Sequence, residues 1–479
     1  MARTMPQAHK FQANDVLHFM SVTDASARIA AGELSPVDLV EAYLARIEAV
    51  DGRIRSYITV TGEAALDAAR RAEAEIAAGR RIGPLHGIPF AVKDNYYTRG
   101  VRTTGGSRLL LDWVPTETAT AIERLQAEGA ILLGKLNTWE YGTGNAGVYH
   151  DLPFEVARNP WKLDRFTGGS STGSGASVAA GTAMAALGSD TGGSVRLPAA
   201  ACGLQGLKPT YGRISRAGIL PNCYTLDVPG PLCWTVSDCA LLLQATAGVD
   251  PRDPATAAVP VPDYSAGIDA GVNGLRLGVL RRFHERDIPT DPAIAAAFDE
   301  AVAIFKGLGA EIVELDLPVA AGTFGDCTRI INSVESLSIH ERDFHERHAL
   351  MGQALREKMM GGLLVRGVDY LRAIRHRREL ATIVDGVVST CDAVLSAGAC
   401  HVAPPFDDQA KIVAFTRESA TPVYNVSGHP ALSLCTGFDA DGLPLNIAVV
   451  GRYFDEQTVL RVGFAYERAT EWRSRRPSL

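Results

Sequence analysis

The chain has 479 residues, of which 46% are hydrophobic and 21% are charged, so it can build a large core and is not a disordered protein. Its 54 acidic and 47 basic residues give a formal net charge of −7. This balance lacks the basic surface of nucleic-acid-binding and anionic-membrane-binding proteins, so we expect neither partner. The sequence shows no secretory signal or membrane-spanning run, and its eight cysteines lack CxxC spacing. These features predict a cytoplasmic protein.

Helices and short apolar strands are predicted to alternate along the chain. The run Ser35-Pro36-Val37-Asp38 supplies an N-cap serine, a proline at the first helical position and an acidic first turn. The predicted helices are 37–50, 62–81, 118–129 and 293–309. The predicted strands are 88–93, 130–135, 275–280, 391–397 and 445–451. Short buried strands between helices predict an α/β fold, a mixed central sheet with helices on both faces.

Residues 249–267 are the most linker-like part of the chain, because they are rich in proline and aspartate. They could separate two domains, or they could form a surface excursion within one domain. Strands of the same style resume after this stretch, so we favour the excursion.

Glycine is concentrated between Thr167 and Gly212, where two Gly-Gly-Ser units occur, at 168–170 and 192–194. A flexible linker does not explain this region, because residues 174–188 between the two units include Val, Met and Leu among small residues. We predict a tightly packed helix there. The region has no GxxxxGK[ST] pattern, so it does not predict a phosphate-binding loop.

The run Gly169-Ser170-Ser171-Thr172-Gly173 satisfies GxSxG, the nucleophile elbow of α/β-hydrolases, with Ser171 as its nucleophile. Such an elbow also needs an acid and a later histidine. Several histidines lie downstream, so the residues alone leave an esterase that uses Ser171 open.

The segment 168–212 closely resembles the signature of the amidase signature family, almost residue for residue. Five further blocks resemble the same family: 32–51, 86–95, 103–144, 226–243 and 428–451. The resemblance covers nearly the whole chain, with 270–420 the least typical part. It implies a single amidase signature domain over 1–479. Within it we expect an N-terminal helical segment at 1–70, a catalytic core at 86–245 and a variable substrate-entrance region at 320–420.

The resemblance implies a catalytic group of Lys93, Ser170 in a cis peptide, and Ser194 as the nucleophile, with Ser171 as a supporting bystander. A serine hydroxyl needs a base, and a lysine can serve when burial lowers its pKa enough to keep it neutral. Lys93 follows the apolar run PFAV, which is consistent with burial. The alternative role for Lys93 is an ion pair with Asp94.

The second Gly-Gly-Ser unit is suited to holding an oxyanion, because glycine leaves backbone N–H groups uncovered. The candidate donors are the amides of Thr191, Gly192, Gly193 and Ser194. We interpret Asp190 and Arg196 as charged braces of this loop. The candidate pocket residues are Tyr149, His150 and Cys202, of which Cys202 is expected to pack beneath the site.

The histidine-rich stretch 340–348 raises the question of a metal site. His340, His345 and His348 do not have the HExxH spacing, so we predict a solvated charged helix instead. Neither a metal nor another cofactor is expected.

The family resemblance implies an amidase that hydrolyses a carboxamide or a related C–N bond, ureas and carbamates included, through an acyl-enzyme. We expect a small-molecule amide substrate and no nucleic-acid or membrane partner; a homodimer is common among similar enzymes. The alternative is the glutaminase A subunit of a tRNA-dependent amidotransferase. Its usual RRI-x-LG-like segment for holding glutamine is missing, and Arg366, Arg372 and Arg375 are arranged differently. A binding protein with a dead site is the third option, and the complete Lys-Ser-Ser set argues against it.

Overall fold

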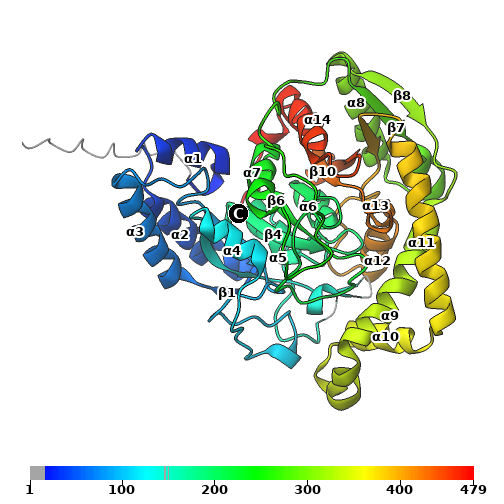
Figure 1. Cartoon of the computed structure of the whole chain (residues 1–479), viewed down its shortest axis with the longest axis horizontal. Coiled ribbons are helices and arrows are strands. Elements are labelled where there is room, and N and C mark those ends of the chain that lie inside the picture. Colours follow the sequence, from blue (N-terminus) through cyan, green and yellow to red (C-terminus); the bar gives the residue numbers. More distant parts are fainter. Residues whose placement is uncertain (1–16, 145–146, 149) are drawn as a thin grey trace, which may run out of the picture.

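An eleven-stranded mixed sheet runs through the protein and carries helices on both faces (Figure 1). The computed structural model describes residues 17–144, 147–148 and 150–479. The strand order is β1-β3-β2-β4-β6-β5-β10-β11-β9-β7-β8. The strands are β1 (Tyr57–Val60), β2 (Pro89–Lys93), β3 (Ile131–Leu136), β4 (Ala185–Asp190), β5 (Gln205–Lys208), β6 (Val228–Cys233), β7 (Arg276–Leu280), β8 (Glu311–Leu315), β9 (Ala393–Ser396), β10 (Ala431–Phe438) and β11 (Pro444–Gly451).

Alternating side chains of the central strands build a core on each side of the sheet. Leu432 and Leu434 of β10 pack in one core, whereas Ala431 packs in the other. The first face is covered by α1 (Val22–Ala30), α2 (Pro36–Ile54), α3 (Gly62–Ala77), α4 (Thr120–Ala127), α7 (Val236–Thr246), α8 (Pro292–Gly307) and α14 (Glu456–Ala469). The second face is covered by α5 (Thr172–Ala180), α6 (Arg196–Cys202), α9 (Ala321–Arg347), α11 (Gly367–Val388), α12 (Gln409–Arg417) and α13 (Thr421–Ser427). The α/β fold with a doubly covered sheet is therefore confirmed.

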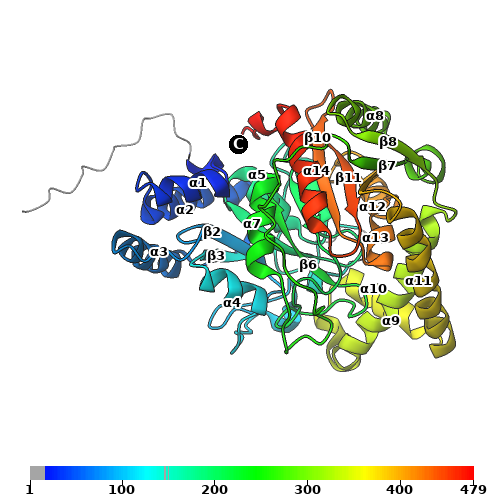
Figure 2. The same cartoon turned by 45° about the horizontal axis from the view of Figure 1, so that its top comes forward.

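The helix α10 (Gln353–Leu363) packs against α9 rather than against the sheet. Figure 1 and Figure 2 show α9, α10 and α11 at one edge of the molecule, opposite α1, α2 and α3. No helix in the described ranges is long and apolar enough to cross a membrane.

Parallel pairing aligns the ends of β2 and β4 at one edge of the sheet. Ala91 pairs with Ala186, and Val92 pairs with Leu187. Because parallel strands end at the same edge, the last residues, Lys93 of β2 and Asp190 of β4, lie at that edge with the loops that follow them.

The predicted helices and strands are found close to their expected bounds. The predicted N-cap is present at α2, where Ser35 Oγ accepts from the backbone N–H groups of Val37 and Asp38. The predicted helix 174–188 is wrong in its second half. The helix α5 ends at Ala180, Gly181 takes a left-handed φ of 73°, and the chain then enters β4. Apolar runs of this length do not distinguish a strand from a buried helix by periodicity.

The proline-rich stretch 249–267 is anchored to the rest of the domain at its start. The Asp250 carboxylate accepts from Ser215 Oγ at 2.6 Å and from Thr120 Oγ1, and Asp253 pairs with Arg216 at 2.9 Å. These contacts join it to residues far away in the sequence, so it is an excursion within one domain, as favoured above.

The glycines of α5 allow this helix to lie directly on neighbouring backbone. A Cβ at Gly173 would lie 2.4 Å from both the Asn137 nitrogen and the Ser56 carbonyl oxygen. We therefore predict that Gly173→Ala lowers the free energy of unfolding by about 1–3 kcal/mol, because the backbone atoms cannot move aside cheaply.

Urea unfolding measures this effect, with Gly386→Ala in α11 as the matched control. No atom lies within 4 Å of a Cβ at Gly386, so that exchange should stabilise the helix by about 0.5–1 kcal/mol. An unchanged urea midpoint for Gly173→Ala would contradict the close packing of α5.

Candidate active site

The ammonium group of Lys93 lies at the end of β2 and is completely buried. Its Nζ donates to Ser170 Oγ at 2.7 Å and to Ser189 Oγ at 3.0 Å. Within the described residues no carboxylate is in ion-pair range of Lys93. Burial lowers the pKa of Lys93 to about 7, against the opposing charges of Asp227 and Asp190. Lys93 is therefore a lysine that can be neutral near physiological pH.

The alternative pairing of Lys93 with Asp94 is wrong. Asp94 lies beside a different buried lysine, Lys135, with 3.3 Å between Nζ and Oδ1. Asp94 also accepts from the backbone N–H of Thr104 at 2.8 Å. The neighbouring carboxylate is thus already used, and Lys93 keeps only hydroxyl partners.

Ser170 lies in the loop that leads into α5, and its peptide bond with Gly169 is cis, as expected from the family resemblance. The Trp139 N–H donates to the Ser170 carbonyl at 3.1 Å. A Cβ at Gly142 would lie 3.3 Å from Lys93 Nζ and 3.6 Å from Ser170 Oγ. The segment 139–142 therefore forms the wall directly behind the Lys93–Ser170 pair.

Ser194 lies between β4 and α6 and is half-buried. Together with Thr191 and Gly192 it lines a cavity of about 380 Å³, a size that suits a small ligand. The Ser171 N–H donates to the Ser194 carbonyl at 3.3 Å, which joins the two Gly-Gly-Ser loops. The structure thus places Ser194 at the cavity and ties its loop to the one that carries Ser170.

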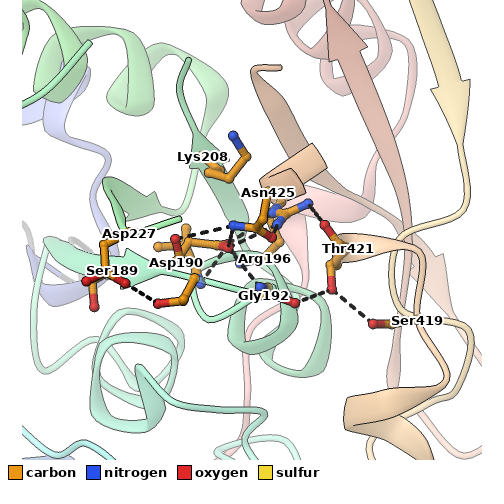
Figure 3. A network of polar contacts seen from close by, with 12 residues as sticks. Ser189, Asp190, Gly192, Arg196, Lys208, Asp227, Ser419, Thr421 and Asn425 are labelled. Carbon is orange, nitrogen blue, oxygen red and sulfur yellow. Dashed lines mark hydrogen bonds and ion pairs between the residues drawn. The ribbon is translucent and has the colours of Figure 1, made fainter. Parts of the chain in front are cut away.

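A buried ion pair holds the Ser194 loop in place (Figure 3). Arg196 Nη2 and Nε each donate to a different oxygen of Asp190, both at 3.0 Å. Arg196 also donates to the Thr421 carbonyl at 3.0 Å, and Thr421 Oγ1 donates to the Gly192 carbonyl at 2.7 Å. Asn425 Nδ2 donates to Asp190 Oδ1 at 2.8 Å. The expected bracing role of Asp190 and Arg196 agrees with this geometry, and α13 supplies the other half of the brace.

The charge of Asp190 is maintained although the residue is fully buried. Burial alone would raise the pKa of Asp190, but the Arg196 charge and the hydrogen bonds from Arg196 and Asn425 hold it well below its usual range. The carboxylate is therefore ionised at every pH at which the protein is expected to work.

The expected set of oxyanion donors needs one correction. The Gly193 N–H donates to Asp190 Oδ1 at 2.8 Å, so this amide belongs to the brace and is not free for a substrate oxygen. The amides of Thr191, Gly192 and Ser194 have no backbone acceptor among the described residues. These three amides remain as candidate donors. The sequence could not separate Gly193 from its neighbours, because the acceptor is a side chain three residues away.

The alternative nucleophile, Ser171, is completely buried and does not line the cavity. Its hydroxyl faces the backbone of Ser189, 3.4 Å from both the nitrogen and the carbonyl oxygen. An elbow requires a strand that runs directly into the turn, whereas residues 165–171 form a loop. The GxSxG match therefore does not form an elbow in this structure, and a supporting role for Ser171 stays a prediction.

Of the candidate pocket residues, His150 and Cys202 are not among those that line the cavity. His150 is exposed and lies 5.9 Å from the Phe406 ring, away from the cavity. Cys202 is fully buried on α6, where its Sγ contacts the Thr167 carbonyl at 3.6 Å. It therefore packs beneath the loop, as expected, but does not line the cavity. Tyr149 lies outside the described residues.

The stretch 340–348 continues α9, and no group of metal-ligating side chains is found in the described part of the chain. His340 is not solvated, however. It is 5% exposed and its ring lies 4.4 Å from that of Tyr141. Burial lowers the pKa of His340 to about 4, so the ring is neutral. It packs against the segment behind Lys93 rather than facing water.

A half-buried lysine that the sequence did not single out, Lys358, lines the cavity from α10. Lys358 Nζ donates to Asn332 Oδ1 at 2.9 Å, to Asn222 Oδ1 at 3.0 Å and to Thr143 Oγ1. Within the described residues it has no carboxylate in ion-pair range. Burial lowers the pKa of Lys358 to about 8, which leaves it mostly charged at neutral pH. No motif or spacing marks this residue, because its partners come from three distant segments.

A neutral Lys93 is the form that can accept a proton, so we predict a pH dependence. The rate at which a fluorophosphonate labels the protein should rise with pH up to about 7 and level off above it, because protonated Lys93 is inactive below that pH. Lys93→Met should lower the rate by about 10²–10⁴. A labelling rate that is flat from pH 5 to 9 would contradict a lysine base.

Removing the carboxylate of the brace should damage both folding and reactivity. We predict that Asp190→Asn lowers the free energy of unfolding by about 3–5 kcal/mol, because Arg196 is left buried without its counter-charge. The same variant should also slow fluorophosphonate labelling, because the Gly193 amide and the Ser194 loop lose their anchor.

The matched control for this brace is Glu456→Gln, which disturbs the equally buried pair with Arg213 at 3.4 Å, away from the cavity. It should destabilise the protein but leave the labelling rate unchanged in the folded fraction. Equal losses of labelling in both variants would contradict a specific role for Asp190 in holding the loop.

Curated relatives include the A subunit of glutamyl-tRNA(Gln) amidotransferase from Chloroflexus aggregans, which is 39% identical over 487 residues. The match covers 97% of this chain and 99% of that protein. Its name makes that relative one part of an enzyme that uses glutamyl-tRNA(Gln). The expectation that partners are limited to a small-molecule amide, without nucleic acid, is therefore wrong. The expectation was based on net charge, and the net charge of one chain does not report whether an assembly that contains such a chain binds nucleic acid.

Solved structures show the same fold over the whole chain. The peptide amidase of Stenotrophomonas maltophilia superposes with a TM-score of 0.84 at 32% identity, and covers 96% of this chain and 98% of that one. The A subunit of glutamyl-tRNA(Gln) amidotransferase from Thermotoga maritima gives a TM-score of 0.79 at 30% identity, with 96% of each chain covered. The family model described as Amidase matches residues 38–460. The chain thus belongs to the amidase family, whose signature blocks the sequence resembles.

Proposed function

We propose that this protein cleaves a carboxamide C–N bond through an acyl-enzyme on Ser194, and that it does so as the amide-hydrolysing A subunit of a tRNA-dependent amidotransferase. The observation that carries the chemistry is the 2.7 Å contact of Lys93, a buried lysine with a lowered pKa, with Ser170 beside the Ser194 loop. The relatives named above support the role within such an assembly. A cytoplasmic location belongs to the same proposal.

In the first half of the reaction, Ser194 Oγ attacks the carbonyl carbon of the amide. Its proton passes to Ser170, and the Ser170 proton passes to neutral Lys93. The oxygen of the tetrahedral intermediate accepts hydrogen bonds from backbone amides of the 191–194 loop. The proton then returns through Ser170 to the leaving nitrogen and the C–N bond breaks. Ammonia departs, and the acyl group remains as an ester on Ser194.

The second half repeats the same proton path with water as the nucleophile. A water molecule attacks the ester carbonyl and gives its proton to Lys93 through Ser170. The ester C–O bond breaks, the carboxylic acid is released, and Ser194 Oγ regains the proton. One base thus serves both halves, so no cofactor is needed for the balance of atoms and charge.

The substrate cavity is suited to an amide that also carries charged groups. Lys358 offers an ammonium group whose hydrogen-bond partners are neutral oxygens, so a substrate carboxylate can pair with it. Asp326, which pairs with Arg329, and Glu418, which pairs with His401, line the same cavity, and each carboxylate has a second oxygen that can accept from a substrate ammonium group. A primary carboxamide with both charges, such as glutamine, satisfies this arrangement.

The arginines that counted against the amidotransferase alternative do not take part in the cavity. Arg366 and Arg372 are exposed on the solvent side near the start of α11, where both pair with Asp369, and Arg375 is exposed as well. Their arrangement therefore says nothing about the ligand. Among the described residues, the cations that line the cavity are Lys358, Arg329 and Arg417.

The nucleophile assignment is tested with Ser194→Ala and glutamine as the substrate. Ammonia release should fall by at least about 10³-fold, because the remaining groups only position water. Ser171→Ala is the matched control and should keep most of the activity. Loss of activity in Ser171→Ala with full activity in Ser194→Ala would overturn the mechanism.

The substrate class is tested with Lys358→Met. We predict that KM for glutamine rises about tenfold or more, whereas KM for butyramide, which has no carboxylate, stays the same. Ammonia release from each amide measures both values. A wild-type enzyme that prefers butyramide to glutamine would contradict the charged-substrate proposal.

The role in an assembly is tested by adding the remaining subunits of a tRNA-dependent amidotransferase and misacylated glutamyl-tRNA(Gln). Amidated tRNA should form from glutamine only in the presence of this chain with an intact Ser194. Full glutamine hydrolysis with no transfer to tRNA under these conditions would refute the proposed assembly role and leave the acyl-enzyme chemistry intact.

A further inference from the structure

Glu140 is a buried carboxylate that the proposed reaction does not use. It lies in η3 (Glu140–Gly142), the segment behind Lys93 and Ser170, and it is 3% exposed. Ser107 Oγ donates to its Oε1 at 2.6 Å, and the Gly352 N–H donates to its Oε2 at 2.9 Å. Each oxygen therefore serves a different part of the chain.

The Gly352 contact reaches the helix that carries Lys358. Gly352 is the N-cap residue of α10, and Lys358 lies six residues further along the same helix. A Cβ at Gly352 would lie 2.9 Å from Glu140 Oε2 and 2.7 Å from Leu152, so the close approach depends on glycine. The helix α10 has a second link to the chain next to η3, because Lys358 Nζ donates a hydrogen bond to Thr143 Oγ1.

The segment that carries Glu140 is itself fixed to the reacting groups. The Tyr141 N–H donates to the Gly105 carbonyl at 2.6 Å, and Tyr141 takes a left-handed φ of 51°. Gly142 follows, and only the absence of a side chain there leaves room for Lys93, because a Cβ at Gly142 would lie 3.3 Å from Lys93 Nζ. Glu140 therefore fixes the position of α10 relative to the segment that lies behind Lys93 and Ser170.

We propose that Glu140 is a positioning residue that sets the distance between the substrate-binding ammonium of Lys358 and the reacting groups by fastening the N-terminus of α10 to η3. This inference rests on the proposed role of Lys358 as the partner of a substrate carboxylate. Loss of the fastening moves the ammonium but leaves Lys93, Ser170 and Ser194 in place. Binding of a charged substrate then weakens, while the nucleophile stays as reactive as before.

A second carboxylate at this helix start does not replace Glu140. Asp151 accepts from the Gln353 N–H at 2.7 Å, but it belongs to the loop that follows residue 149, and no hydrogen bond between it and η3 is found among the described residues. Asp151 therefore holds the start of α10, but it does not fix α10 relative to the segment behind Lys93.

The test compares Glu140→Met with Glu140→Gln. Methionine is of similar length but accepts neither hydrogen bond. Glutamine keeps both, since its amide oxygen can accept from Gly352 and its NH₂ group can donate to the Ser107 hydroxyl. We expect Glu140→Met to raise KM for glutamine about tenfold with kcat changed by less than about threefold, and Glu140→Gln to restore KM to near the wild-type value.

Fluorophosphonate labelling and Lys358→Met complete the experiment. The probe carries no carboxylate, so its labelling rate should be the same in Glu140→Met and wild type. A labelling rate that falls as much as kcat/KM for glutamine, or a Glu140→Gln variant as impaired as Glu140→Met, would overturn the positioning role. An unchanged KM for glutamine in Lys358→Met would refute the proposed binding of the substrate carboxylate by Lys358, on which the role of Glu140 rests. A raised KM in Lys358→Met with a normal KM in Glu140→Met refutes the role of Glu140 alone.

Discussion

The buried ion pair between Asp190 and Arg196 is the interaction on which the rest of the site depends. Asp190 ends β4, and its two oxygens receive the guanidinium of Arg196 as well as the backbone N–H groups of Gly193 and Val195. The tight turn that presents Ser194 is thus wound around one carboxylate. Since burying such a pair brings little net stability, its value is the fixed shape that it gives the loop.

Three buried lysines and the half-buried Lys358 show how the environment decides what a lysine can do. Lys135 lies beside Asp94 and stays a structural cation, and Lys208 donates to the Pro209 carbonyl near the Asp190 brace. Lys93 has only serine hydroxyls as direct partners, and burial lowers its pKa to about 7. Lys358 is held by two amide oxygens and one hydroxyl next to a cavity. The residue type is the same in each case. A carboxylate beside Lys135 keeps it a structural cation. Lys93 and Lys208 have neutral oxygens as direct partners, and burial lowers the pKa of both to about 7, so what distinguishes Lys93 is its contact with Ser170.

The catalytic half of the site could be predicted from the sequence because its residues lie in continuous motifs. Lys93 ends an apolar strand, and Ser170 and Ser194 each follow a pair of glycines, so local pattern and family resemblance were sufficient. For the cavity the sequence indicated a region, the substrate-entrance stretch 320–420, but not the individual residues. His150 and Cys202 were chosen for their position near the motif in sequence, whereas the cavity wall is formed by α9, α10 and the residues after α12. The second half of the predicted helix 174–188 failed for a related reason, since only pairing with β2 and β6 makes that apolar run a strand.

The reacting groups and the substrate-binding cavity come from different parts of the fold, and this separation affects substrate specificity. The base and its bridging serine are fixed by the sheet edge and by η3, whereas Lys358 comes from a helix that packs on α9 and not on the sheet. Helices at the edge of the molecule can shift relative to the sheet without disturbing the strand ends. An arrangement of this kind lets one acyl-transfer apparatus serve different amides, but it requires a link that keeps the two parts in register. Buried polar groups with a partner on each side, such as Glu140, fulfil that requirement, because any relative movement leaves one of their hydrogen bonds unmade at a substantial cost in free energy.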